Sequence, residues 1–390
     1  MDRRVFLHAA LTAGVVAESL AATAVADAQA YAAAGAPPPP AFPPVDARSV
    51  WMVGDTGPLT PSAYAARLAA LTAGHDEVRD GYLAHGAVDA LEKAFATYLG
   101  KEDCAFFPTG TLANNVAMRV LAGDNHHALC HYESHLYLDE SDAAERLSGL
   151  NLAPLGKGRP WFTAEEAAAA IDAAEHGPYP LKVGAITIES PVRRQKGQVM
   201  PLAEVQAVAA LAKAHGAGLH LDAARLMLAP PTLDRAAYFA PFDTVYVSLY
   251  KYLDAPFGAV LAGSKAHIEQ AREYRHLYGG LIYQGWPAAL IALEALKTFP
   301  ERIAHAHAAA TRLFQALEAS GKVRLAPSEH ASNIYALKME KALADAAFER
   351  CRAAGVRLGH WGADDGTLPF FVNDTLNRRP VEEFAKLILG

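Results

Sequence analysis

Cysteine is scarce in this chain. Its three cysteines, Cys104, Cys130 and Cys351, lie far apart, and their spacing matches no zinc or thiol-redox motif. An odd number also excludes complete pairing into disulfides within the chain. The sequence therefore indicates no metal site, and we expect the cysteines to be small buried apolar side chains.

Long runs of one charge are also missing. The formal net charge is -7, and charged residues make up 20% of the 390 residues. Since no basic stripe or patch can be read from the sequence, it gives no reason to expect a nucleic-acid partner. Hydrophobic residues make up 52%, which is enough for a large core spread over two to three lobes.

The N-terminus has no apolar run that suits a membrane span, because Glu18 interrupts its Ala-rich stretch. Arg3 and Arg4 precede that stretch, and alanines at residues 24–30 offer several A-x-A cleavage sites. Residues 1–30 thus resemble a twin-arginine export signal. They predict a periplasmic or exported protein without a membrane anchor, and a cytoplasmic one if the signal is not used. An accidental arginine pair before an Ala-rich tail is the alternative.

Residues 31–48 are predicted to be a linker. Four consecutive prolines at residues 37–40 cannot join a helix or a central strand, and they favour an extended polyproline form. We therefore expect a large folded domain over residues 49–299 and a smaller C-terminal domain over residues 300–390.

Strand and helix patterns alternate through the expected large domain. Short apolar runs predict strands at residues 103–107, 183–188, 218–221 and 244–249. Helical patterns and helix-stop glycines predict helices at residues 63–73, 88–99, 202–215, 264–277 and 287–298. This alternation predicts an α/β fold with a mostly parallel sheet. From residue 300 onward a helix, short strands and a final helix at residues 381–389 predict an α+β domain.

Three features suited to bind pyridoxal phosphate (PLP) follow predicted strands. The Gly110–Asn114 turn opens a helix, where free backbone N–H groups and the helix dipole suit a phosphate. Asp222 ends one strand, where a carboxylate can keep a pyridinium nitrogen protonated. Lys251 follows another strand, although alone it reads as a surface lysine. Because ligands of open parallel sheets bind at the carboxyl ends of strands, we expect the three to converge.

Longer segments carry a family resemblance over residues 50–296. They read GDTGPLTP, LEKAFATYLGKEDCAFFPTGTLANNVA, ESHLYLDE, ITIESPVRRQKGQVMPL, HLDAARL, SLYKYLDAPFGAVLAGS and YGGLIYQGWPAAL. In order and spacing they resemble the threonine aldolase and β-eliminating lyase family of fold-type I PLP-dependent enzymes. The resemblance implies an aspartate aminotransferase-like large domain with a mostly parallel seven-stranded sheet, and a small α+β C-terminal domain. It also implies PLP as cofactor, a small amino-acid substrate and a homodimer or homotetramer.

The resemblance implies roles for residues around the cofactor. Lys251 matches the lysine that forms the Schiff base, and Asp222 matches the partner of the pyridine nitrogen. Arg225 matches the arginine beside the cofactor O3′ oxygen. His135 matches the histidine stacked on the ring and implicated as a base. The phosphate turn is matched by Gly110, Thr111 and Asn114.

Other matches concern the substrate. Asp55 and Thr56 match the motif that lines the substrate site, and Tyr82 matches a tyrosine lent by the partner subunit. Arg193 stands in an E-x-P-x-R segment, ESPVR, beside the cofactor region. Each has a structural alternative: Tyr82 as a core residue, or Arg193 on a solvated turn.

The chain departs from the family where the substrate carboxylate is held. The family's late arginine has no counterpart in DGTLPFFVND, residues 365–374, and Tyr283 stands where an arginine would reach the neighbouring cofactor phosphate. Tyr250 precedes Lys251 where a serine is usual. Since a guanidinium binds a carboxylate in bidentate fashion, our hypothesis is that Arg193 takes over this task.

The implied activity is cleavage of the Cα–Cβ bond of β-hydroxy-α-amino acids to glycine and an aldehyde, as in threonine aldolases. The loss of the late arginine keeps β-elimination, racemisation and transamination open on the same scaffold. A non-catalytic exported binding protein is a further alternative, which retention of Lys251, Asp222 and Arg225 disfavours.

Overall fold

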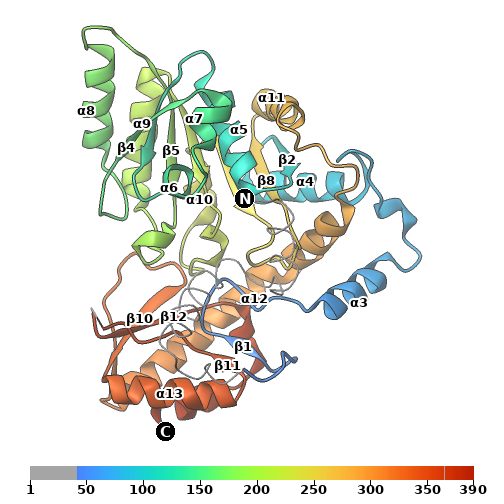
Figure 1. Cartoon of the computed structure of the whole chain (residues 1–390), viewed down its shortest axis with the longest axis vertical. Helices are drawn as coiled ribbons and strands as arrows, with labels where there is room; N and C mark the ends of the chain where they lie inside the picture. The colour runs from blue at the N-terminus through green and yellow to red at the C-terminus, as the bar shows by residue number, and fades with distance from the viewer. Residues whose placement is uncertain (1–41, 364) are drawn as a thin grey trace, which may run out of the picture.

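The computed structural model describes residues 42–363 and 365–390 (Figure 1). The export signal predicted at residues 1–30 and the greater part of the linker predicted at residues 31–48 lie outside the described residues. Within the described ranges, no helix combines the length and the apolar character needed to cross a bilayer.

A seven-stranded sheet organises the larger part of the chain, with the strand order β2-β8-β7-β6-β5-β3-β4. Only β8 runs antiparallel to its neighbours in this sheet. The prediction of an α/β fold with a mostly parallel seven-stranded sheet is confirmed. The strands are β2 (Asp103–Phe107), β3 (His127–His131), β4 (Asn151–Leu155), β5 (Val183–Glu189), β6 (Gly218–Asp222), β7 (Thr244–Ser248) and β8 (Ala259–Gly263).

Side chains of the strands alternate between two cores, because successive residues of a strand point to opposite faces. Cys104 and Phe106 of β2 pack into the core on one face, while Ala105 and Phe107 pack into the core on the other. The first face is covered by α4 (Gly86–Leu99), α8 (Ala164–Glu175), α9 (Leu202–His215) and the start of α12 (Trp286–Ala319). The second is covered by α5 (Gly110–Ala122), α7 (Ala143–Ser148) and α11 (Lys265–Leu277).

The cysteines belong to these apolar layers. Cys104 and Cys130 lie in β2 and β3, Cys351 lies in α13 (Lys341–Ala353), and all three are buried and unpaired. Burial raises the pKa of each thiol. The prediction that they are buried apolar side chains is therefore confirmed.

The long helix α12 corrects one prediction. The sequence predicts a helix that ends at residue 298, before Pro300, yet α12 runs from Trp286 to Ala319 with Pro300 inside it. A proline removes one helical hydrogen bond. Buried Phe299 and Ile303 flank it, so one apolar face continues along the helix and offsets this loss. The predicted domain boundary at residues 299 and 300 falls inside α12, and the division into domains stays a prediction.

The C-terminal part contains a three-stranded antiparallel sheet of order β12-β10-β9, in which β9 contacts α12, and the helices α13 and α14 (Val381–Leu389), which pack against each other. Its strands are β9 (Val323–Leu325), β10 (Ile334–Met339) and β12 (Thr367–Phe371). The first described strand, β1 (Val50–Trp51), pairs in parallel with β11 (Val356–Arg357) of this part. The segment after β1 therefore starts beside the C-terminal part, and it leads to Asp55.

Further elements complete the described part of the chain, and among them α3 projects away from the body of the molecule (Figure 1). These elements are α3 (Pro61–Thr72), α6 (His135–Leu138), α10 (Arg235–Phe239), and the 3-10 turns η1 (Asp76–Val78), η2 (Arg193–Gln195), η3 (Leu226–Leu228) and η4 (Asp374–Arg378).

Candidate active site

A cavity of about 260 Å³ opens at the carboxyl ends of β5, β6 and β7. Glu189 ends β5, Asp222 ends β6 beside it in register, and Lys251 follows the end of β7. The predicted convergence at strand ends is therefore found. The predicted site residues that line the cavity are Gly110, Thr111, Asn114, His135, Asp222, Arg225 and Lys251.

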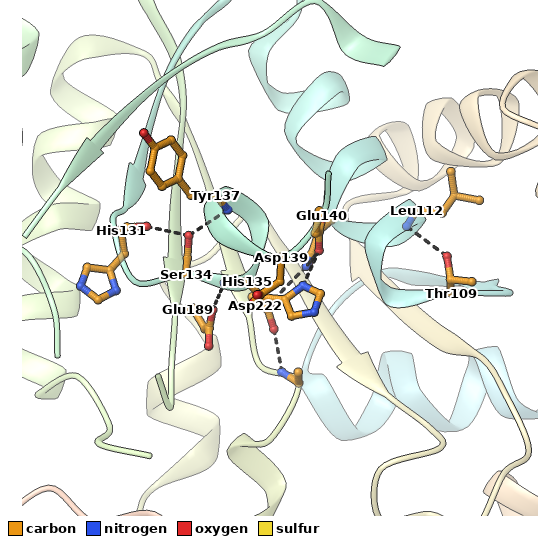
Figure 2. A network of polar contacts seen from close by, with 12 residues as sticks. Thr109, Leu112, His131, Ser134, His135, Tyr137, Asp139, Glu140, Glu189 and Asp222 are labelled. Atoms are coloured by element: carbon orange, nitrogen blue, oxygen red, sulfur yellow. Dashed lines mark hydrogen bonds and ion pairs between the residues drawn. The ribbon is translucent and has the colours of Figure 1, made fainter. Parts of the chain in front are cut away.

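The N-terminus of α5 forms one wall of the cavity. Thr109 caps this helix, its hydroxyl accepting a hydrogen bond from the Leu112 N–H at 3.2 Å (Figure 2). A Cβ atom on Gly110 would lie 2.1 Å from the Tyr246 hydroxyl, so glycine is required there. The first N–H groups of a helix have no partner within it and attract anions. This wall therefore suits a phosphate.

Asp222 presents its carboxylate at the end of β6 with both oxygens engaged. Its Oδ2 accepts from Asn114 Nδ2 at 2.8 Å, and its Oδ1 accepts from the Ala224 N–H at 3.0 Å. The side chain of Asn114 is thus committed to Asp222, and it also donates to Glu140. Any contact of Asn114 with a phosphate would come from its backbone.

The ammonium group of Lys251 loses its proton more readily than that of an ordinary lysine. Burial and, second, the charge of Arg225 lower the pKa of Lys251 to about 8. Its ammonium nitrogen lies 5.8 Å from the centroid of the Tyr250 ring. Because the uncharged amine is the nucleophile, Lys251 is prepared to react with an aldehyde near neutral pH.

Arg225 is held by Asp55. The Nε of Arg225 donates to both carboxylate oxygens of Asp55, at 2.8 and 3.1 Å, and only 10% and 11% of the two side chains is exposed. Asp55 is absent from the cavity lining, and it orients Arg225 instead. Thr56 donates to Asp374 at 3.1 Å, which ties the segment to η4.

His135 lies between two buried carboxylates (Figure 2). Its Nδ1 is 2.9 Å from Glu140 Oε1, and its backbone N–H donates to Glu189 Oε2 at 2.5 Å. Burial lowers the pKa of His135, but the hydrogen bond and charge of Glu140 outweigh this, so the pKa lies above its usual value. With Glu140 at Nδ1, the Nε2 atom is the one left to exchange a proton with a ligand.

Two acidic residues of the cavity escape the sequence prediction. Glu140 and Glu189 both line it. Burial and the neighbouring charge of Asp222 raise the pKa of Glu189 to about 7. Glu189 could have been found, since it ends a predicted strand as Asp222 does. No comparable feature of the sequence points to Glu140, because only the fold of the segment that follows α6 brings this residue to the site.

Thr56 lies outside the cavity lining, as Asp55 does, and so do two further predicted residues, Arg193 and Tyr82. Arg193 is the first residue of η2, and its N–H donates to Glu189 Oε1 at 3.3 Å. Desolvation and, second, the charge of Arg225 lower the pKa of Arg193. Tyr82 is 60% exposed, and its ring meets that of Tyr283 edge-on at 5.2 Å.

Comparisons with known proteins agree with this geometry. The model of the family described as β-eliminating lyase matches residues 52–340. A low-specificity L-threonine aldolase of Arabidopsis thaliana is 29% identical over 266 residues, which cover 64% of this chain and 71% of the relative. An alanine racemase of Cochliobolus carbonum is 32% identical over 213 residues, 53% of each chain. The chain thus spans between about half and seven-tenths of the length of these curated relatives.

A solved structure is similar over a greater length. A proposed aromatic amino acid β-eliminating lyase/threonine aldolase of Exiguobacterium sp. 255-15 aligns with a TM-score of 0.72 at 25% identity. The alignment covers 87% of this chain and 97% of that one. The similarity therefore includes the C-terminal part as well as the large sheet.

The lowered pKa of Lys251 can be measured in the cofactor-free protein. We expect the rate of Lys251 acetylation by acetic anhydride, followed by mass spectrometry, to rise with pH with a midpoint near 8. Below that pH the amine is protonated and unreactive. Arg225→Gln should move the midpoint upward, because it removes a positive charge and frees the Asp55 carboxylate. Exposed Lys341 serves as the control, and a Lys251 midpoint equal to that of Lys341 would contradict the assignment.

Proposed function

The chain belongs to the β-eliminating lyase family, and on this basis we propose that it is a PLP-dependent carbon–carbon lyase. It cleaves the Cα–Cβ bond of β-hydroxy-α-amino acids, as threonine aldolases do, to give glycine and an aldehyde. The observation that carries the proposal is the convergence of Lys251, Asp222 and the α5 N-terminus on one cavity.

The polar groups of the cavity suit PLP. The free N–H groups at the N-terminus of α5, which begins at Gly110, and the hydroxyl of Thr111 suit the phosphate. Asp222 suits the ring nitrogen, Arg225 the phenolic oxygen, and the amine of Lys251 the aldehyde. Bound there, PLP supplies an electron sink for negative charge at the α-carbon of the amino acid.

His135 is the base that we assign to the β-hydroxyl proton. Its Nδ1 is occupied by Glu140, so Nε2 takes the proton. Glu140 then stabilises the imidazolium, just as it already raises the pKa of His135. A base acts only within hydrogen-bond reach of its proton, and the place of His135 in the cavity lining supports this role.

The assay uses L-threonine and phenylserine with the PLP-loaded protein. We expect aldehyde release that Lys251→Ala lowers by at least about a thousandfold, because the amine that holds the cofactor is lost. Exposed Lys341→Ala is the matched control and should retain full activity. Absence of aldehyde from every β-hydroxy-α-amino acid tested would refute the cleavage.

A second candidate function is racemisation or β-elimination of an amino acid at the same site. The similarity to an alanine racemase and the absence of an arginine from residues 365–374 favour it. In the same experiment, interconversion of D- and L-alanine, or pyruvate released from a β-substituted amino acid, would identify this outcome.

Arg193 is our candidate for the substrate carboxylate, and the family match adds Asp55 and Thr56 to the substrate side. In β12, where the family pattern places its arginine, the chain carries LPFF (residues 368–371), and no guanidinium comes from that strand. Arg193 lies next to the cavity, because its backbone N–H donates to Glu189, which lines it. Its guanidinium can therefore supply the missing charge at that end of the cavity.

Arg193→Ala should raise KM for the amino acid at least about tenfold and change kcat less, since a ground-state ion pair is lost. Arg194→Ala is the matched control, because that neighbouring guanidinium is paired with Asp139 and should leave KM unaltered. An unchanged KM in Arg193→Ala would rule out the assignment.

We also propose a homodimer, or a homotetramer built from it, in which Tyr82 approaches the partner's cavity. No residue of helix α3 is fully buried within the subunit, although the helix is rich in alanine and leucine. Tyr82 and Tyr283 are 60% and 56% exposed next to each other. Buried Asp80 accepts from the N–H groups of Leu83 and Trp286, so the segment that carries Tyr82 is anchored to α12.

The protein should sediment at two or four times its chain mass. Ala65→Arg with Ala69→Arg places two charges on exposed positions of α3 and should yield monomers, since charge is poorly tolerated in a buried interface. The same pair of changes on α8, Ala169→Arg with Ala173→Arg, is the control. A monomeric wild type, or an α3 variant with the wild-type mass, would refute this interface.

Export remains part of the proposal through Arg3, Arg4 and the alanines of residues 24–30. The twin-arginine route carries folded proteins, so a cofactor bound in the cytosol can travel with the enzyme. If the signal is not used, the enzyme works in the cytoplasm.

A further inference from the structure

A buried histidine that the proposed reaction does not use lies behind the cavity. His220 is in β6, two residues before Asp222, and is fully buried. Its Nε2 is 3.1 Å from Asn114 Oδ1, and its Nδ1 is 2.9 Å from Thr244 Oγ1. The ring therefore connects β7 to α5 directly behind the Asp222 carboxylate.

The amide of Asn114 has one possible orientation. Its nitrogen is 2.8 Å from Asp222 Oδ2 and 3.1 Å from Glu140 Oε1, and carboxylate oxygens accept. A flipped amide would set its oxygen against both carboxylates. The two N–H bonds of Asn114 thus point to Asp222 and Glu140, and its oxygen points to His220.

This orientation determines the tautomer of His220. Since Asn114 Oδ1 can only accept, the proton is on His220 Nε2, and Nδ1 accepts from the Thr244 hydroxyl. Burial lowers the pKa of His220 to about 4, so the ring stays neutral. All polar atoms of this chain of contacts are satisfied, from Thr244 through His220 and Asn114 to Asp222.

We propose that His220 is a positioning residue, which acts through Asn114 to aim the Asp222 carboxylate at the pyridine nitrogen of PLP. The same amide also binds Glu140, the partner of His135. The hydrogen bonds of His220 and Asn114 thereby orient Asp222, which accepts from the ring nitrogen. They also hold Glu140, the carboxylate that contacts His135. Without the Nε2–H donor, Asn114 can turn, and Asp222 loses one of its two fixed hydrogen bonds.

The test measures the protonation of the PLP ring nitrogen and the affinity of the protein for PLP. PLP labelled with ¹⁵N in the ring is bound to the full-length protein and to His220→Leu, and the nitrogen signal and the dissociation constant of PLP are measured. We expect the signal of His220→Leu to move toward that of the unprotonated ring, and PLP to bind about tenfold more weakly, the size of one lost hydrogen bond to a charged group. No amino-acid substrate is present, so the result stands whichever reaction the enzyme performs.

The control is His307→Leu, which removes a buried histidine that donates to the Leu228 carbonyl at 2.8 Å, outside this set of hydrogen bonds. It should leave the ring signal unchanged. A double-mutant cycle with Asn114→Ala tests the route: in that background His220→Leu should add no further shift. His220→Gln, which keeps an N–H donor, should restore part of the signal. If His220→Leu does not fold, His220→Ala, which also lacks the N–H donor, enters the cycle in its place.

A wild-type ring signal and PLP affinity in the His220 variant would overturn the proposal. A His220 effect that persists undiminished in Asn114→Ala would do the same, because it would show that the histidine does not act through the amide. The combination of a shifted signal in His220→Leu, an unshifted one in His307→Leu and non-additivity with Asn114→Ala supports it.

Discussion

The hydrogen bond between Asn114 and Asp222 is the contact on which the geometry of the site depends. It joins the N-terminal part of α5 to the end of β6, and these two elements supply the anion wall and the acidic wall of the cavity. A buried carboxylate without fixed donors is costly, so this contact keeps an acidic group at the sheet edge. His135, held by Glu140, is connected to the same amide. His135, the proposed base, and Asp222, the proposed partner of the ring nitrogen, are therefore parts of one network.

Burial affects the acidic and basic groups of the cavity in opposite directions. It raises the pKa of Glu189 to about 7 and lowers the pKa of Lys251 to about 8. Both residues thus exchange protons close to neutral pH, where a group is most useful for acid–base work. Arg225 behaves differently, because its pairing with Asp55 outweighs burial and raises its pKa. The cavity thereby combines the permanently charged Arg225 with Glu189 and Lys251, whose charges change near neutral pH.

The departures from the family pattern concentrate on the substrate side. Within the described residues, β12 supplies no arginine, and its pairing with β10 continues through Pro369. On the cofactor side, Lys251, Asp222 and Gly110 lie where the family pattern predicts. The cofactor side of the cavity thus keeps the family pattern, while the substrate side differs from it.

The sequence by itself determined the strands, the glycine turn and the lysine that meet at the site. These follow from local rules: short apolar runs form strands, a glycine opens a helix, and the ends of parallel strands lie at one edge. Only the tertiary structure decided that α12 continues through Pro300 and that Glu140 reaches His135. It alone also showed that Asn114 serves Asp222. Such contacts join residues distant in the chain, and the packing of helices on the sheet determines which side chains meet.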